Sequence, residues 1–191
     1  MQELSKEEFA LSLQQNVESL LHEETLFIYP TDTIYGIGCV ATNCAAVRKL
    51  RAVKSRSKRP FSVIAPSKQW ILDNCEVGTK EQAWIDKLPG AYTLILKLKN
   101  KRAVCPECNN DLATLGVRIP KHWISKAVEQ MGVPIVTTSA NLTGGYYMTS
   151  MDDLEPSIKA QVAFCVYEGA LKSAPSTLVD LTKEGMDIIK R

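Results

Sequence analysis

The segment LFIYPTDTIYGIG, residues 26–38, gives the clearest indication of the fold. Its first four residues form a short apolar run that stops at Pro30, which is typical of a buried strand. The residues after Pro30 place hydroxyl groups, one carboxylate and two glycines in what we expect to be a single turn. Hydroxyl groups and loop amides can orient a small polar ligand, and glycines let a backbone approach closely. The same residue types also build ordinary turns, so the segment alone leaves both interpretations open.

Outside this segment, apolar runs and helical patterns alternate along the chain. Strands are expected at residues 61–65, 91–99, 116–119, 134–138, 162–167 and 177–181. Helices are expected at residues 43–53, 68–74, 80–87 and 122–132. A capping box at Ser5–Glu8 predicts one more helix, packed through Phe9, Leu13, Val17, Leu20 and Leu21. Such interleaving predicts an α/β sheet covered by helices. Residues 91–99 alternate apolar side chains with polar ones such as Thr93, which predicts one solvated face and therefore a mixed sheet.

The size and composition fit one globular domain. The chain has 191 residues, of which 45% are hydrophobic and 23% charged, and we expect a single domain over residues 1–191. The net charge of +2 neither requires nor excludes a nucleic-acid partner, but seven Lys or Arg residues and no acid fall between Arg48 and Arg59. The apolar runs are far shorter than the ~20 residues of a membrane span, and the polar, acidic N-terminus is unlike a signal peptide. These features predict a cytoplasmic protein without membrane association.

Two further loop segments are rich in groups that bind anions. Residues 54–60, KSRSKRP, place Lys54 and Arg56 two positions apart, so that in an extended loop both side chains point at one anion. No GxxxxGK[ST] motif occurs, which excludes a P-loop nucleotide site. Residues 134–145, PIVTTSANLTGG, lead from a strand to Ser139 and Asn141, which can bond phosphate oxygens or a base edge. A solvated basic loop and a plain strand-exit turn are the alternatives.

Two shorter segments add one cation and one hydroxyl group. Residues 115–120, LGVRIP, place Arg118 inside an apolar strand. A buried guanidinium is costly unless it is paired, so we expect a carboxylate partner from a ligand or from the protein. Residues 175–180, PSTLVD, place Ser176 at the entry to a late strand.

The cysteines give no clear metal motif. They are Cys39, Cys44, Cys75, Cys105, Cys108 and Cys165. Cys105 and Cys108 form a CxxC, but no second CxxC or close His pair completes the four ligands that zinc usually takes. We therefore expect reduced cysteines and no resident metal; a local disulfide and a metal shared between chains are the alternatives.

Taken together, the segments resemble the YrdC family of threonylcarbamoyl-AMP synthases. The matching pieces are PTDTIYGIG, KSRSKRPF, PGAYTLILK, LGVRIP, TTSANLTGG and STLVD, which occur in family order from Pro30 to Asp180. The resemblance implies an α/β fold with an open, twisted mixed sheet, flanking helices and a concave, positively lined cavity. It also implies a nucleotidyltransferase that makes threonylcarbamoyl-AMP and pyrophosphate from L-threonine, bicarbonate or CO2, and ATP. The product would serve the N6-threonylcarbamoyladenosine modification of tRNA.

The resemblance assigns roles to individual residues. Lys54 and Arg56 match the catalytic, phosphate-binding pair, and Ser139 and Asn141 match further ATP contacts. Threonine contacts match Thr33, Arg118 and Ser176, with Arg118 on the substrate carboxylate. Thr114 and Arg191 are weaker candidates on the ATP side. Mg²⁺ would accompany ATP, bound largely through phosphates and water. A tRNA threonylcarbamoyl transferase would receive the product.

Some positions depart from the family pattern. Arg59 stands where an Asn usually precedes the Pro, and Ile64 stands where some members carry a His. The chain also resembles the short, single-domain form, because the longer form has an extra C-terminal domain.

Two other functions compete with this one. A double-stranded RNA or tRNA-binding module would use the whole Arg48–Arg59 cluster and would not need Thr33, Arg118 or Asn141. A related carbamoyl-transfer domain with another substrate is the third interpretation.

Overall fold

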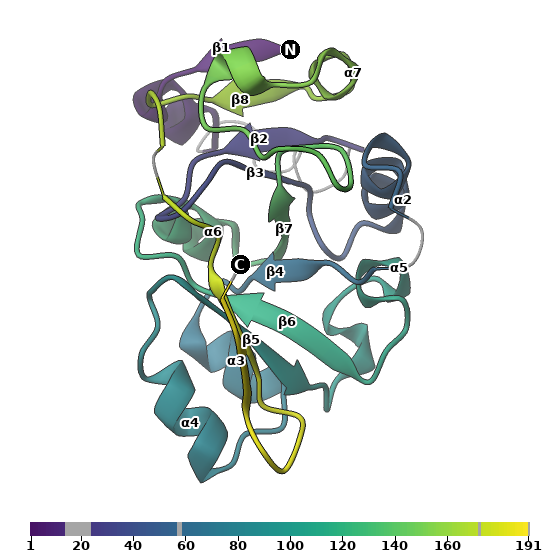
Figure 1. Cartoon of the computed structure of the whole chain (residues 1–191), viewed down its shortest axis with the longest axis vertical. Coiled ribbons are helices and arrows are strands. Elements are labelled where there is room, and N and C mark those ends of the chain that lie inside the picture. The colour runs from purple at the N-terminus through teal and green to yellow at the C-terminus, as the bar shows by residue number, and fades with distance from the viewer. Residues whose placement is uncertain (14–23, 57–58, 172, 191) are drawn as a thin grey trace.

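The computed structural model describes residues 1–13, 24–56, 59–171 and 173–190. Within these residues ten strands form one sheet in the order β1-β8-β2-β3-β7-β4-β6-β5-β9-β10 (Figure 1). The sheet contains parallel pairs, such as β4 with β6, and antiparallel pairs, such as β4 with β7. The sheet is therefore mixed and flanked by helices, as the sequence predicts.

The elements lie close to the predicted ranges. The strands are β1 (Gln2–Leu4), β2 (Phe27–Tyr29), β3 (Gly36–Gly38), β4 (Ser62–Ile64), β5 (Tyr92–Lys97), β6 (Thr114–Arg118), β7 (Ile135–Ser139), β8 (Phe164–Val166), β9 (Thr177–Asp180) and β10 (Asp187–Ile189). In the described residues after β3, the α-helices are α2 (Cys44–Val53), α3 (Lys68–Asn74), α4 (Thr79–Ile85), α5 (Pro106–Asn109), α6 (Ile124–Met131) and α7 (Pro156–Lys159). The predicted Gly cap is confirmed, since Gly132 ends α6 with a left-handed φ of 69°.

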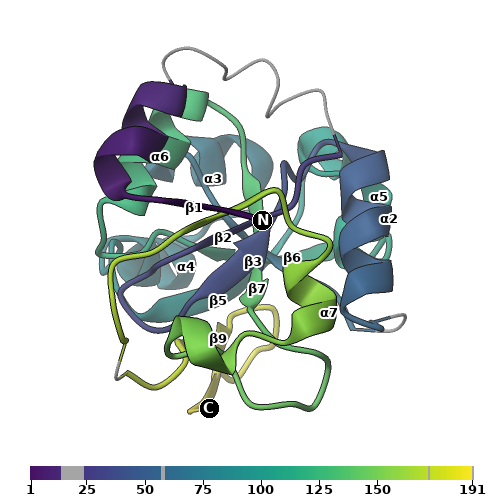
Figure 2. The same ribbon diagram turned by 90° about the horizontal axis from the view of Figure 1, so that it is seen from above.

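Side chains on the two faces of the sheet enter separate cores. In β2, Phe27 and Tyr29 pack with α6, whereas Ile28 packs in the core that contains the buried face of α2. This is the alternation expected of a strand that is covered on both faces. Figure 2 shows α6 on one side of the sheet and α2 with α5 on the other.

The N-terminal capping box is confirmed. The N–H of Ser5 donates to Glu8 Oε2 (2.7 Å), and the N–H of Glu8 donates to Ser5 Oγ (3.2 Å). Helical residues follow at 6–13, with Phe9 and Leu13 buried. The predicted contacts of Val17, Leu20 and Leu21 lie outside the described residues.

The end of the opening segment forms a strand rather than part of a turn. Gly36–Gly38 is β3, which pairs with β2 and with β7. A Cβ on Gly38 would lie 2.0 Å from the carbonyl oxygen of Val136. Gly38 therefore allows β7 to approach, and this glycine serves strand packing.

One predicted solvent-facing residue is buried. Thr93 in β5 is 2% exposed because its hydroxyl group bonds with Ser176 Oγ (2.8 Å) at the start of β9. The prediction of a solvated face is wrong at this position, where the hydroxyl group contacts the residue that precedes β9, whereas Lys97 in the same strand is exposed.

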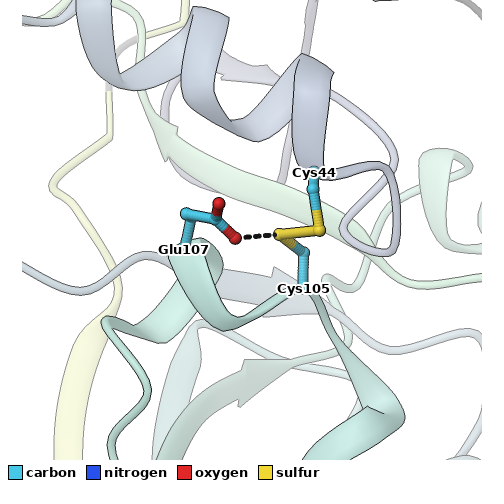
Figure 3. A group of neighbouring side chains, drawn as sticks. All are labelled: Cys44, Cys105 and Glu107. Carbon is cyan, nitrogen blue, oxygen red and sulfur yellow. Dashed lines mark hydrogen bonds between the residues drawn. A yellow bond between two sulfur atoms is a disulfide. The ribbon is translucent and has the colours of Figure 1, made fainter.

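The expectation of reduced cysteines is also wrong at one place. Cys44, the first residue of α2, forms a disulfide with Cys105, which precedes α5 (Figure 3). Cys108, the other half of the CxxC, is free and buried. The sequence motif fails as a guide because the fold brings Cys105 to a residue 61 positions away.

Candidate functional site

A cavity of about 240 Å³ lies across the middle of the sheet. It is bounded by residues from the β2–β3 loop, from β3, β7, β4, β6 and β5, and from the entry to β9. Most of its lining side chains are short and carry hydroxyl groups, which leaves the space open. The lining includes Thr31, Thr33, Tyr35, Gly36, Arg56, Ser62, Thr93, Arg118, Thr137, Thr138, Ser139, Tyr147 and Ser176.

Arg118 lies at the C-terminal end of β6 and is 5% exposed. Its Nη2 forms a salt bridge with Asp32 Oδ1 (2.5 Å), while Nη1 lies 3.4 Å from Thr33 Oγ1. Oδ2 of Asp32 accepts the N–H of Lys121 (2.8 Å). The predicted carboxylate partner is therefore Asp32 in this structure. Sequence reasoning missed this residue, although it is the carboxylate of the opening segment.

Thr33 is held in place by its own loop. The Oγ1 of Thr31 donates to the carbonyl of Ile34 (2.7 Å) and accepts the backbone N–H of Thr33 (3.1 Å). The two threonine hydroxyl oxygens lie 3.0 Å apart, so Thr33 donates to Thr31. An oxygen lone pair of Thr33 then faces Arg118, and the loop presents a fixed hydroxyl group to the cavity.

An extended loop is expected to point Lys54 and Arg56 at one anion. In the structure the two side chains point to different places. Lys54 continues α2 with helical dihedral angles, and Ser55 has a φ of 49°, so the segment is not extended. The Lys54 side chain is 1% exposed, and its Nζ donates to the carbonyls of Ser139 (2.5 Å) and Asn141 (2.6 Å). Burial, and then repulsion by Arg56, lower the pKa of Lys54 to about 7. Lys54 therefore supports the loop behind the cavity.

Arg56 does line the cavity. Its Nη1 donates to Thr138 Oγ1 (3.1 Å), and its Nη2 donates to the carbonyl of Pro60 (2.6 Å). The guanidinium also stacks over the ring of Phe61, with Cζ 4.9 Å from the ring centroid. These contacts fix a planar cation at the edge of the cavity, which is a geometry suited to phosphate.

Ser139 and Asn141 form one bonded unit, of which Ser139 lines the cavity. Ser139 Oγ donates to Asn141 Oδ1 (2.6 Å), which also lies 3.2 Å from Lys54 Nζ. Asn141 Nδ2 donates to the carbonyl of Gly145 (2.6 Å). Asn141 thus orients Ser139 from behind, and the Ser139 oxygen keeps acceptor capacity toward the cavity.

Of the nine residues proposed from sequence, the cavity lining contains Thr33, Arg56, Arg118, Ser139 and Ser176. Lys54 and Asn141 lie directly behind it. Thr114 is at the opposite end of β6 from Arg118 and is not in the lining. Arg191 lies outside the described residues.

Tyr35 is a cavity residue that sequence reasoning did not propose. Its Oη donates to the carbonyl of Gly169 (2.7 Å) and accepts the N–H of Glu168 (3.1 Å). Burial raises the pKa of Tyr35 to about 12. The residue therefore connects the segment after β8 to the cavity wall. Its position within residues 26–38 could have indicated from sequence that it lies at the site.

The basic Arg48–Arg59 cluster makes mostly internal contacts. Among its described members, five donate to other parts of the protein: Arg48, Lys49, Arg51, Lys54 and Arg56. Arg48, for example, forms a salt bridge with Glu107 (2.7 Å). Fewer of these cationic side chains are therefore available to bind the phosphates of a nucleic acid than the sequence suggests. In the described part of the chain, no helix combines the length and apolar character needed to cross a membrane.

Comparisons with known proteins identify the family of the chain. The family model of the Sua5, YciO and YrdC proteins, described as "Telomere recombination", matches residues 19–191. A Methanocaldococcus jannaschii protein, provisionally named threonylcarbamoyl-AMP synthase, is 34% identical over 184 residues, which cover 94% of this chain and 84% of the relative. Threonylcarbamoyl-AMP synthase of Bacillus subtilis is 32% identical over 155 residues, or 79% of this chain and 44% of the relative.

A solved structure has the same fold. P. abyssi Sua5, crystallised with L-threonine, matches with a TM-score of 0.84 at 23% identity, over 98% of this chain and 56% of that one. This chain thus spans less than half of the Bacillus relative and little more than half of the Sua5 chain.

Proposed function

Because this chain belongs to the family of the Sua5, YciO and YrdC proteins, we propose that it is a threonylcarbamoyl-AMP synthase. The names of its relatives support this activity. The observation that carries the proposal is the shared cavity, in which two guanidinium groups converge with hydroxyl groups from separate segments, among them those of Thr33, Ser139 and Ser176. Guanidinium and hydroxyl groups can bind both the carboxylate of an amino acid and the phosphates of a nucleotide.

The threonine half of the substrate is assigned to Arg118, Thr33 and Ser176. The Arg118 guanidinium binds the threonine carboxylate, for which it offers planar two-point bonding. Thr33 and Ser176 supply hydroxyl groups near it, and Asp32 keeps the guanidinium oriented. A cavity of about 240 Å³ holds an amino acid, so the nucleotide extends from its mouth.

The chemistry needs positioning and charge neutralisation more than a strong base. The threonine amine first combines with bicarbonate or CO2 to give a carbamate; with bicarbonate, one water leaves. A carbamate oxygen then attacks the α-phosphorus of ATP, a P–O bond forms, and the bond to the β-phosphate oxygen breaks. Arg56 neutralises and orients the phosphates as pyrophosphate leaves. The Ser139 hydroxyl group can bind a phosphate oxygen by turning its hydrogen from Asn141 Oδ1 toward that oxygen. Lys54 and Asn141 act here by holding the Ser139 loop.

Mg²⁺ is proposed to enter with ATP. Both oxygens of Asp32 already accept hydrogen bonds, and the other groups named at the cavity are neutral hydroxyl groups or cations. This donor set suits an ion held mainly by phosphate oxygens and water, with hydroxyl groups such as that of Ser139 bonding its water shell. The ion would neutralise phosphate charge.

The product is proposed to pass to a tRNA threonylcarbamoyl transferase. Threonylcarbamoyl-AMP is an activated mixed anhydride that water can hydrolyse, so prompt transfer to an acceptor would preserve it. Direct tRNA contact would depend on the members of the basic cluster that project to solvent, such as Arg59.

The decisive experiment is incubation with ATP, bicarbonate and amino acids, followed by measurement of pyrophosphate and of the adenylate product. Pyrophosphate release is expected to need threonine and bicarbonate together, with serine a poor substitute. Alanine or valine at rates equal to threonine would contradict the assignment of threonine. A protein that bound double-stranded RNA tightly and released no pyrophosphate would favour the RNA-binding alternative.

A further inference from the structure

The Cys44–Cys105 bridge joins two elements next to the candidate site. Cys44 is half-buried at the start of α2, and Cys105 is 3% exposed just before α5. The carboxylate of Glu107 lies beside the bridge, with Oε2 2.7 Å from Cys105 Sγ (Figure 3). Its other oxygen accepts a hydrogen bond from Arg48, one turn after Cys44 on α2 (2.7 Å). The bridge therefore joins a half-buried cysteine to a buried one, with a hydrogen-bond acceptor beside it.

We propose that Cys44 and Cys105 form a reversible thiol–disulfide exchange site for low-molecular-weight thiols and disulfides, which controls how firmly the Arg56 side of the cavity is held. The effect on ATP rests on the proposed function; the exchange itself does not.

The exchange is a two-electron reaction with a simple balance. An external thiolate attacks Cys44 Sγ, on the less buried of the two residues, and the bond to Cys105 breaks. Cys105 leaves as a thiolate, takes up a proton and donates it in a hydrogen bond to Glu107. A second external thiol attacks the mixed disulfide and releases Cys44 as a thiol. The sum is one protein disulfide and two external thiols giving a protein dithiol and one external disulfide; oxidation is the reverse.

The other cysteines are poor competitors for this chemistry. Cys39, Cys75, Cys108 and Cys165 are free and buried. Burial raises the pKa of Cys75, Cys108 and Cys165 to about 12, and it raises that of Cys39 as well. Because the thiolate is the reactive form, exchange should be selective for the Cys44–Cys105 pair.

Arg51 connects this pair to the cavity. From α2, its Nε donates to the carbonyl of Glu107 (2.6 Å), and its Nη2 donates to that of Cys108 (3.3 Å). Its Nη1 donates to the carbonyls of Arg56 (2.8 Å) and Arg59 (3.2 Å). One guanidinium thus holds α5 and the Arg56 backbone together. When the bridge opens, α5 loses its covalent link to α2, and the Arg56 segment loses part of its support.

The first test follows the exchange directly. The full chain would be equilibrated in graded mixtures of reduced and oxidised glutathione, then alkylated, and the free thiols located by mass spectrometry. Cys44 and Cys105 are expected to titrate together, while Cys108 stays unlabelled under native conditions. A bridge that resists excess dithiothreitol in the folded protein would overturn the proposal. So would stoichiometric zinc held by the reduced protein, since the pair would then be a metal site.

The second test measures the coupling. Calorimetry with ATP is expected to show affinity lower by about fivefold in the reduced protein than in the oxidised one. Cys44→Ser should show the lower affinity under both conditions, and Cys75→Ala, at a buried cysteine outside the bridge, should behave as wild type. Equal ATP affinity in both redox states would overturn the coupling.

Hydrogen exchange separates this inference from the proposed function. The amides of Lys54, Ser55 and Arg56 should exchange faster after reduction, in the absence of any ligand. If this occurs but neither redox state binds ATP, the proposed function fails and the exchange site stands. If these amides are unaffected by reduction, the coupling through Arg51 fails whatever the ligand.

Discussion

The pairing of Arg118 with Asp32 decides how the threonine side of the cavity can work. A guanidinium that is 5% exposed needs a nearby anion, and Asp32 supplies this anion by forming a salt bridge with Arg118. Because Asp32 is anchored by the Lys121 N–H, it also fixes the direction of the guanidinium. Asp32 is thus a positioning residue that acts through Arg118.

Asp32→Asn should separate this role from general stability. The variant keeps a similar shape but loses the charge, so we expect the KM for threonine to rise by about tenfold, equivalent to ~1.4 kcal/mol. The kcat at saturating threonine and the KM for ATP should change little. Steady-state kinetics of pyrophosphate release would measure all three.

The matched control is Asp187→Asn, which removes an exposed ion pair with Lys183 and should alter none of these constants. An unchanged KM for threonine in Asp32→Asn would show that Arg118 is oriented by other contacts.

The lowered pKa of Lys54 predicts a pH dependence of stability. With a folded pKa of about 7 and an ordinary value of 10.5, the unfolded chain binds a proton that the folded protein lacks between these pH values. The contribution of Lys54 to stability should therefore increase with pH across this window, by up to about 1.4 kcal/mol per pH unit, and be flat below it. Lys54→Met should remove this contribution to the slope.

Urea unfolding of wild type and Lys54→Met at several pH values would measure this difference. Lys97→Met, at an exposed position of β5, should keep the wild-type slope and serves as the control. Parallel pH profiles for wild type and Lys54→Met would mean that Lys54 stays protonated in the folded protein.

At the level of strands, the close approach of β3 to β7 depends on Gly38. Gly38→Ala would place a methyl group 2.0 Å from the Val136 carbonyl, so the backbone must shift. We expect a loss of about 1–3 kcal/mol in the free energy of unfolding, measured by denaturant titration. Gly185→Ala meets no atom within 4 Å and should leave stability close to wild type. Equal stability of the two variants would show that β3 and β7 can separate without cost.

How far sequence predicted these elements depends on the range of their contacts. The helix Cys44–Val53 follows from local signals, with Asn43 Oδ1 accepting the N–H of Ala46 as its cap. Strand β3 has few β-formers and is held between β2, which is near in sequence, and β7, which lies about a hundred positions away, so its own residues do not predict it. The burial of Lys54 likewise depends on carbonyls of Ser139 and Asn141, 85 and 87 positions away. For Arg118, the sequence predicts only that some carboxylate must pair with it, and the structure identifies that carboxylate as Asp32.

Across the molecule, the sheet holds two cations at one cavity from different strands and loops. Arg56 enters from the segment after α2, and Arg118 enters from the end of β6. Under the proposed function, one faces phosphate and the other faces the threonine carboxylate. Substitution of Arg56 should therefore weaken mainly ATP binding, and substitution of Arg118 mainly threonine binding. Neither a nonspecific basic surface nor an RNA-binding module predicts this division.

Arg56→Ala and Arg118→Lys test this division in one experiment. Arg56→Ala should weaken ATP binding by about tenfold or more and change threonine binding less, since a hydrogen bond to a charged group contributes ~1.5–3 kcal/mol. Arg118→Lys keeps the charge but loses the two-point geometry, so it should weaken threonine binding by about tenfold with little effect on ATP. Calorimetry of each variant with ATP and with threonine gives four affinities. Binding of double-stranded RNA is measured separately over a range of salt concentrations. Arg118→Lys should leave the RNA affinity and its salt dependence unchanged, because the net charge is preserved. Equal losses for both substrates in both variants would mean that the cavity is a single anion site. Loss of RNA binding in Arg118→Lys with intact synthase activity would assign the cavity to nucleic acid instead.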